Sequence, residues 1–180
     1  MKKNLERVIK IPEGVEVVVA GTDITVKGNG KELKREFILP KISVKVDGKE
    51  LKISAKGATK RESKLMGTAW AHIKNMIAGT QEDFVYKLEI ANVHFPMSVK
   101  VEGDKVSIKS FLGETTERIA KIVPGVEVKV EGNQVEVKSS EIEKAGQTAA
   151  NIEKATRLTG RDRRVFQDGI FITEKTGRVI

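Results

Sequence analysis

The sequence contains no cysteine. This absence excludes a disulfide framework, catalysis by a thiol and zinc bound by thiolates, so folding does not require an oxidising compartment. Aromatic residues are also scarce, at 4% of the chain. No predicted strand carries the exposed aromatic pair on which single-strand RNA-binding domains stack bases. The composition thus disfavours both thiol chemistry and extensive base stacking.

Long hydrophobic runs are lacking as well. No apolar stretch approaches the roughly 18 residues of a membrane span, and no apolar run typical of a signal peptide follows residues 1–6. Hydrophobic residues nevertheless make up 39% of the 180 residues, which is enough to form a core. We therefore expect a folded, cytoplasmic protein.

Positive charge is what the chain has in excess. Lysine and arginine outnumber aspartate and glutamate by 33 to 25, which gives a net charge of +8. Residues 1–82 hold 17 basic and 10 acidic residues, whereas residues 83–180 hold 16 and 15. Five of the nine arginines nevertheless fall within residues 157–180. A basic chain favours an anionic partner such as nucleic acid, although a solvated lysine surface would give the same balance.

The four prolines reveal an internal repeat. They stand at positions 12, 40, 96 and 124, so each of the second pair lies 84 residues after its counterpart. Polar and β-branched residues alternate after each proline and predict a β-hairpin. A further strand, from about residue 85 to 91, is predicted to open the second copy. The expected hairpin turns are near Gly21-Thr22-Asp23, Asp47-Gly48-Lys49, Gly103-Asp104 and Glu131-Gly132-Asn133.

A predicted helix closes each copy. Thr59-x-x-Glu62 and Ser140-x-x-Glu143 have the spacing of capping boxes, in which a hydroxyl and a carboxylate satisfy free backbone donors at a helix start. Gly79 and Gly160 are the expected C-terminal stops. Starts and stops are both 81 residues apart, so the two helices should have equal length.

The sequence therefore predicts an α+β fold of two tandem duplicated domains, each a small antiparallel β-sheet packed with one α-helix. The expected N-terminal repeat covers residues 1–82 and the C-terminal repeat residues 83–180. Apolar residues from 65 to 77 and, with more alanine, from 142 to 158 recur at helical spacing. These stripes should face the two sheets.

Residues for catalysis or metal binding do not occur at suitable spacing. His72 and His94 have no placed partner and are interpreted as surface or packing residues. Gly28-x-Gly30 is not followed by a helix, so it is interpreted as a turn between strands and not as a phosphate loop. Carboxylates alternate with lysines, as solvated cross-strand pairs do. We therefore expect a protein that is not an enzyme and has no cofactor or metal.

The strongest binding signal is a cluster of arginines after the second helix. Arg157 stands near the expected helix end, where a cation also complements the helix dipole. Arg161, Arg163 and Arg164 lie beyond the stop at Gly160, so the dipole does not account for them. Because arginine binds phosphate through a planar, bidentate fork, the cluster favours contact with a nucleic-acid backbone.

The tail of the chain resembles a known signature. Residues 160–171, with Gln147 upstream and Lys175 downstream, closely resemble the C-terminal signature of the ribosomal protein six family of the large subunit, archaeal and eukaryotic type. The resemblance extends over essentially the whole chain. Phe171 departs from the family, which often has tyrosine there, by one hydroxyl. Further similarities are Pro12-Glu13-Gly14-Val15, Gly67-Thr68-Ala69-Trp70 and Phe111-Leu112-Gly113-Glu114.

The resemblance implies a structural constituent of the large ribosomal subunit that arose by duplication of one domain. Such proteins bind large-subunit rRNA near the sarcin–ricin loop and the stalk base, beside other stalk-base ribosomal proteins and where translational GTPases dock. The second domain is then expected to make the principal rRNA contacts. A free-standing RNA-binding or ribosome-assembly module remains the alternative.

The residues expected to bind RNA come from the resemblance and from charge. Arg161, Arg163, Arg164 and Gln167 are carried over from the signature, and Asp168-Gly169 is expected to shape the turn that presents them. Lys175 and Arg178 follow them in the same carry-over. Charge and position add Arg157 and, as weaker candidates, Lys109, Lys60, Arg61 and Lys64.

Overall fold

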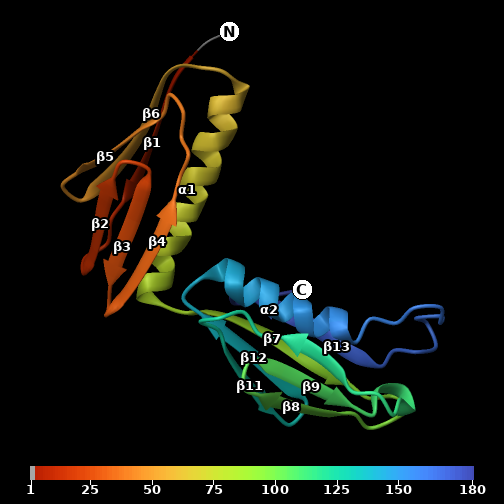
Figure 1. Cartoon of the computed structure of the whole chain (residues 1–180). Coiled ribbons are helices and arrows are strands. Elements are labelled where there is room, and N and C mark those ends of the chain that lie inside the picture. Colours follow the sequence, from red (N-terminus) through yellow and green to blue (C-terminus); the bar gives the residue numbers. More distant parts are fainter. Residues whose placement is uncertain (1–2) are drawn as a thin grey trace. The chain divides into compact units, whose positions relative to one another are not determined.

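The computed structural model describes residues 3–180, with side chains from Asn4 onward. The chain divides into two compact units, Met1–Glu82 and Asp83–Ile180, called here the N-terminal and the C-terminal unit. Each contains antiparallel sheets and one long helix (Figure 1). The predicted α+β fold of tandem duplicated domains is therefore confirmed, although the strands of each unit form two sheets instead of one.

The N-terminal unit packs two three-stranded sheets against the helix α1 (Lys60–Gln81). Ile24 and Val26 of one sheet and Leu51 and Ile53 of the other alternate along their strands and are almost fully buried. The helix buries a stripe that includes Ile73 against both sheets. The sheets have the orders β1–β6–β5 and β2–β3–β4, with bounds Lys3–Lys10 (β1), Val15–Ala20 (β2), Asp23–Gly28 (β3), Lys31–Glu36 (β4), Ser43–Asp47 (β5) and Glu50–Ala58 (β6).

The C-terminal unit repeats this plan and extends it. Its helix α2 (Ile142–Ala155) packs on a five-stranded sheet of order β11–β12–β7–β13–β14 and on a three-stranded sheet of order β10–β9–β8 (Figure 1). A short 3-10 helix, η1 (Phe111–Gly113), follows β9. The strands are Phe84–Ala91 (β7), Ser98–Glu102 (β8), Lys105–Lys109 (β9), Arg118–Lys121 (β10), Glu127–Glu131 (β11), Gln134–Ser139 (β12), Gly169–Lys175 (β13) and Arg178–Val179 (β14).

Small residues bring α2 close to its sheet. Ala145, Ala149 and Ile152 are fully buried against the strands. Gly146 lies beside Tyr86, and a Cβ at this position would come within 3.1 Å of the tyrosine Oη. The alanine-rich stripe therefore sets a short distance between helix and sheet, and larger side chains would separate them.

The four predicted hairpins are confirmed. β2 pairs with β3, β5 with β6, β8 with β9 and β11 with β12, all antiparallel and with two-residue turns. Each turn contains a glycine with positive φ, as at Gly48 and Gly132 (both φ +59°), which the mirror-image hairpin turns require. The Gly28-x-Gly30 segment is likewise a turn, between β3 and β4.

The helix boundaries agree with the sequence only at the start of α1. There the capping box of Thr59 and Glu62 is present, and both hydroxyl and backbone N–H of Thr59 donate to the carboxylate. The stop predicted at Gly79 is wrong, because α1 continues to Gln81 and Gly79 is buried within it.

Both expected boundaries of the second helix are also wrong. Glu141, not Ser140, occupies the N-cap position of α2, and the hydroxyl of Ser139 accepts the N–H of Glu141 at 3.3 Å. The helix ends at Ala155, and Gly160 lies in the following loop with φ +72°. The two helices therefore have 22 and 14 residues, not equal lengths.

Candidate nucleic-acid interface

Residues 156–168 connect α2 to β13 and are called here the arginine loop. They contain no regular helix or strand. The side chains of Arg157, Arg161, Arg163 and Arg164 are all exposed, and Arg164 is 90% exposed. The structure thus brings four of the predicted RNA-binding residues, together with the exposed Gln167, into one segment.

Asp162 folds the tip of the loop into a tight turn. Its carbonyl oxygen accepts the backbone N–H groups of Val165 and Phe166, and its carboxylate accepts that of Arg164. The Arg164 guanidinium also pairs with this carboxylate at 2.8 Å. These hydrogen bonds from Arg164 lower the pKa of Asp162 below its ordinary value. Arg164 is thereby oriented by the loop itself, while Arg163 takes part in no ion pair that the described residues form.

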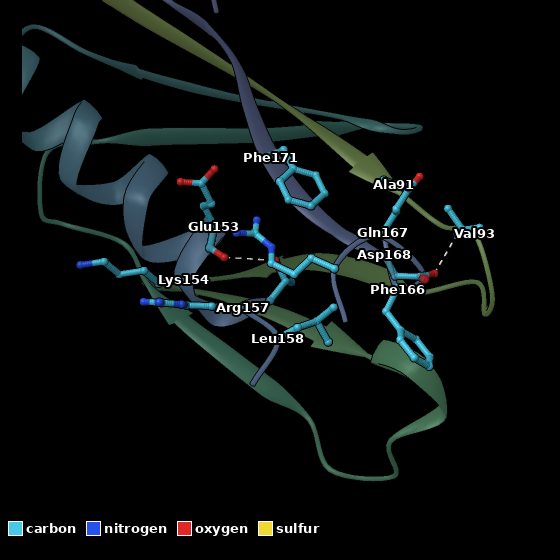
Figure 2. Close-up of a pocket in the computed structure, with 12 residues that line it drawn as sticks. Ala91, Val93, Glu153, Lys154, Arg157, Leu158, Phe166, Gln167, Asp168 and Phe171 are labelled. Carbon is cyan, nitrogen blue, oxygen red and sulfur yellow. Dashed lines mark hydrogen bonds between the residues drawn. The ribbon is translucent and has the colours of Figure 1, made fainter. Parts of the chain in front are cut away.

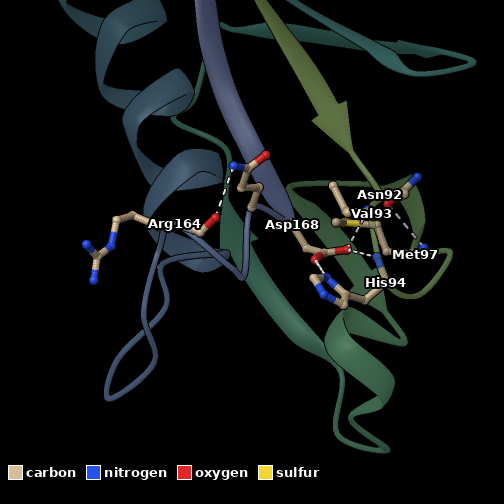
Figure 3. A network of polar contacts seen from close by, with 7 residues as sticks. Asn92, Val93, His94, Met97, Arg164 and Asp168 are labelled. Carbon is tan, nitrogen blue, oxygen red and sulfur yellow. Dashed lines mark hydrogen bonds and ion pairs between the residues drawn. The ribbon is translucent and has the colours of Figure 1, made fainter.

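A buried carboxylate, Asp168, fastens the end of the loop to the segment after β7 (Figure 3). One of its oxygens accepts the backbone N–H groups of Val93 at 2.7 Å and His94 at 2.9 Å, and the other lies 2.6 Å from His94 Nδ1. Burial alone would raise the pKa of Asp168, but the hydrogen bonds from His94 and Val93 outweigh it and lower the pKa to about 2. The carboxylate is therefore ionised at neutral pH and can only accept, so Nδ1 carries the hydrogen.

An aromatic and cationic stack covers this anchor. The rings of His94 and Phe166 stack with their centroids 5.1 Å apart and their planes inclined by 28°. The guanidinium of Arg161 lies over the ring of Phe166, with its Cζ atom 4.9 Å from the ring centroid. Such cation–π contacts restrict a long side chain without neutralising its charge. Arg161 is thus positioned as a cation that remains available to an anion.

Arg118 on β10 holds the end of α2. Its guanidinium donates to the carbonyl oxygen of Ala155 at 2.9 Å, which the helix leaves without an internal partner, and to that of Arg157 in the loop at 3.4 Å. It also forms a bidentate pair with Glu114, at 2.8 and 2.7 Å, and lies 4.3 Å above the ring of the buried Phe111. Arg118 therefore fixes where the helix stops and the arginine loop begins.

A pocket of about 660 Å³ opens between the end of α2, the arginine loop and the strands β7 and β13 (Figure 2). Leu158, Phe166 and Phe171 form apolar parts of its wall. Cationic side chains also line it, and in Figure 2 those of Lys154 and Arg157 extend in the same direction from the end of α2. The lining residues are Ala91, Val93, Glu153, Lys154, Thr156, Arg157, Leu158, Arg163, Phe166, Gln167, Asp168 and Phe171.

Lys175 and Arg178 lie at the other end of β13. They face each other in the β13–β14 hairpin and are both exposed. Because a strand rises about 3.3 Å per residue, the six steps from Gly169 to Lys175 separate the hairpin from the arginine loop by about 20 Å. The structure thus divides the predicted site of the C-terminal unit into two cationic regions.

The weaker candidates are not part of the arginine loop. Lys109 is the last residue of β9, and its ammonium lies 3.9 Å from the carboxylate of Glu117. Lys60, Arg61 and Lys64 belong to the first turns of α1 in the N-terminal unit, and all three are exposed. These lysines and Arg61 remain candidates by charge alone.

Two functional contacts could not be found in the sequence. The sequence indicates no partner for His94, but Asp168, 74 positions away, accepts from both its backbone N–H and its ring, which agrees with the interpretation of His94 as a packing residue. Arg118 was not singled out either, since it lies far from the arginine cluster. A neighbouring acid, Glu114, was the only local sign of its role.

Within residues 3–180, no three His, Asp or Glu side chains gather as they would around a metal ion. No helix among these residues is both long and apolar enough to cross a bilayer.

The cationic loop on the second of two repeated α+β units is the electrostatic footprint of a nucleic-acid-binding protein. Comparison with known proteins specifies the family. The sequence model of the family described as Ribosomal protein L6 matches residues 11–83 and 95–169. The large ribosomal subunit protein uL6 of Methanococcus vannielii is 46% identical over 172 residues, which cover 96% of this chain and 94% of that protein. The chain therefore belongs to the ribosomal protein L6 family, whose members are structural proteins and not enzymes.

Proposed function

We propose that the arginine loop is the main surface by which this chain, as a structural protein of the large ribosomal subunit, holds the rRNA near the sarcin–ricin loop and the stalk base. There it would support the region where translational GTPases bind, beside other stalk-base ribosomal proteins. The observation that carries the proposal is a rigidly anchored loop with four exposed arginines. Family membership supports the coarser role of a large-subunit protein that binds rRNA.

The anchoring of the loop favours binding of a folded RNA over transient attraction to any polyanion. Asp168 and Arg118 fix its two ends, and Asp162 fixes its tip. A loop that is already ordered loses less conformational entropy when it binds. Its guanidiniums can then meet phosphates whose positions are set by the RNA fold.

The β13–β14 hairpin is proposed as a second point of contact. Like charges that face each other across a strand pair destabilise that pair. Lys175 and Arg178 face each other in this way. A phosphate between them would remove this repulsion. The hairpin and the arginine loop would then contact the RNA at points about 20 Å apart, which fits a partner with an extended phosphate surface.

The N-terminal unit is proposed to make a lesser contribution through Lys60, Arg61 and Lys64. The first turn of a helix is the positive end of its dipole, where cations are unfavourable by roughly 0.3–1 kcal/mol. Lys60 and Arg61 stand in that first turn and therefore do not serve the stability of α1. An anionic partner, RNA or protein, would give them a role.

The test is a titration of the full chain against a large-subunit rRNA fragment that contains the sarcin–ricin region, over a series of salt concentrations. A duplex RNA of equal length and unrelated sequence is the control. We expect a strong preference for the fragment and a steep salt dependence. Equal and weak binding to both RNAs would contradict the proposal.

Variants then locate the surface. Replacing Arg161, Arg163 and Arg164 together with alanine should weaken binding and lower the slope of log K against log salt by up to about 3, one for each lost phosphate contact. The matched control replaces Lys27, Lys34 and Lys45, exposed on strands of the N-terminal unit, and removes the same charge. If both triple variants lowered affinity and slope equally, only net charge would matter and the loop assignment would be wrong.

A further inference from the structure

We propose that the pocket beside the arginine loop binds a single rRNA nucleotide that is turned out of its helix, with the base against Phe171 and the phosphate at the cationic side. This inference rests on the proposed function and deepens it, because it assigns one site to base recognition. The scarcity of aromatic residues predicts little stacking, so this pocket would be a local exception.

The size of the pocket fits one nucleotide. Ligand pockets have volumes of about 300–1,000 Å³, and this one measures about 660 Å³. Two or more stacked bases would need a longer, open platform of the kind that single-strand binders provide. A phosphate alone would leave most of the space and all of its apolar wall unused.

The wall offers a flat face to a base. Phe171 is 36% exposed and its ring lies directly against Gly169, where an added Cβ would be only 3.0 Å from the ring atom Cζ. Any side chain at position 169 would displace this ring. In Figure 2 the ring of Phe171 and the side chain of Leu158 lie at the pocket, and Phe166, whose ring already contacts His94 and Arg161, completes its apolar wall. RNA-binding proteins use such surfaces for bases that have left the helical stack.

The charges of the lining select a nucleotide over a neutral ligand. Lys154, Arg157 and Arg163 line the pocket, and none forms an ion pair with another described residue. The two carboxylates of the lining are already engaged. Glu153 accepts the backbone N–H of Ile172 at 3.4 Å, and Asp168 binds the 93–94 segment. Three available cations beside an apolar wall match the phosphate and the base of one nucleotide.

The edge of a base could be read by Gln167. Its side chain is exposed at the pocket and offers an amide nitrogen as donor and an amide oxygen as acceptor. One hydrogen of the nitrogen is donated to the carbonyl oxygen of Arg164 at 3.3 Å. The other amide hydrogen and the amide oxygen remain able to bond a base. The hydrogen bonds that RNA-binding domains make to unstacked bases use the same groups.

The first experiment measures the affinity of the full chain for the rRNA fragment with Phe171→Ala. We expect binding on the order of 10-fold weaker, because base–aromatic stacking is lost, with an unchanged salt slope, because no phosphate contact is lost. Phe171→Tyr retains the ring and should bind within about twofold of the parent chain. The control is Phe95→Ala, which removes a 52% exposed ring that does not line the pocket.

A second variant guards against a change in folding. Val93→Trp alters a 60% exposed lining residue and should fill part of the pocket, again weakening binding without changing the slope. Unchanged affinity in both Phe171→Ala and Val93→Trp would overturn the pocket inference, while the preference of the parent chain for the rRNA fragment would still support the proposed function. A lowered salt slope in these variants would overturn it too, because the pocket would then bind phosphate only.

A third measurement does not depend on the chosen rRNA. The four nucleoside 5′-monophosphates, ribose 5-phosphate and inorganic phosphate are titrated into the isotopically labelled full chain and followed by NMR. At least one nucleotide should shift the resonances of Phe171 and the Gln167 amide, whereas ribose 5-phosphate should shift only the arginine and lysine signals. Identical shifts with all probes, or none at Phe171, would contradict the inference. Nucleotide binding without preference for the rRNA fragment would support the pocket and count against the proposed location.

Discussion

Asp168→Asn tests whether one buried carboxylate holds the arginine loop in place. Asparagine has nearly the same shape, and its amide oxygen can still accept the backbone N–H groups of Val93 and His94. Its amide nitrogen, however, is a donor and would face His94 Nδ1, where the parent chain has a hydrogen bond of 2.6 Å. An imidazole that carries its hydrogen on Nε2 can accept from this nitrogen, so the substitution removes the charge and the charge-assisted hydrogen bond while leaving the packing unchanged.

The cost follows from the pKa of Asp168. The folded protein lowers that pKa from 3.8 to about 2, and each pKa unit corresponds to about 1.4 kcal/mol. The ionised carboxylate thus stabilises the C-terminal unit by about 2 kcal/mol at pH 7. For a unit of about 100 residues, this corresponds to a decrease in Tm of roughly 10 °C in the variant.

The pH dependence gives an independent check on the sign. Because folding lowers the pKa of Asp168, its contribution is fully present above the unfolded pKa near 4 and is lost as the pH falls toward about 2. The difference in unfolding free energy between the parent chain and Asp168→Asn should therefore be about 2 kcal/mol at pH 7. It should shrink toward zero as the pH approaches 2.

The assay is differential scanning calorimetry of the full chain at several pH values. Trp70 is the only tryptophan and belongs to the N-terminal unit, so its fluorescence identifies the transition of that unit, which should not move. Asp162→Asn is the matched control, because its exposed carboxylate pairs with Arg164 at the loop tip and should contribute little. If Asp168→Asn were as stable as Asp162→Asn at pH 7, or if its deficit did not shrink in acid, the anchoring role would be refuted.

Arg118→Ala should destabilise the C-terminal unit by about 2 kcal/mol in urea unfolding. It removes a bidentate pair and leaves the carbonyls at the end of α2 without a donor. Arg118→Lys should recover only part of this loss. Ser139→Ala should lower the free energy of unfolding by about 1 kcal/mol, because the hydroxyl of Ser139 bonds Gly125 and Glu141. Ser140→Ala should change it close to nothing. Equal effects of the two variants in thermal melts would contradict the observed start of α2. Thr59→Ala should lower only the N-terminal transition, by about 1 kcal/mol, as judged by Trp70 fluorescence.

The hairpins could be predicted from the sequence because their determinants are local. A glycine at each turn and alternating β-branched residues on both sides fix the register within a dozen residues, and every predicted turn was found. The start of α1 was equally local, since Thr59 and Glu62 complete a capping box by themselves. The repeat then extended the same interpretation from one unit to the other.

The remaining features depend on contacts that are distant in sequence. α2 ends early, where Arg118 from β10 and the Thr156 hydroxyl take up the last carbonyl oxygens, so Gly160 plays no part in the stop. Ser140 has the spacing of a cap, but the neighbouring Ser139 is the residue that bonds the helix start. The arginines of the candidate site could be proposed from their clustering in the sequence, whereas their anchor at His94 could not, because its partner lies 74 positions away.

The difference between the two repeats explains where the candidate site lies. In the N-terminal unit, β1 stands at the edge of its sheet, and α1 leads almost directly into the next unit. In the C-terminal unit, the corresponding strand β7 is hydrogen-bonded along this edge to β13. The chain reaches β13 only through the arginine loop. The chain continues for 25 residues after α2, whereas α1 is followed almost at once by the next unit. These residues complete a sheet edge, and the segment that makes this possible also carries the exposed arginines, so the binding function is expected to reside where the duplication was extended.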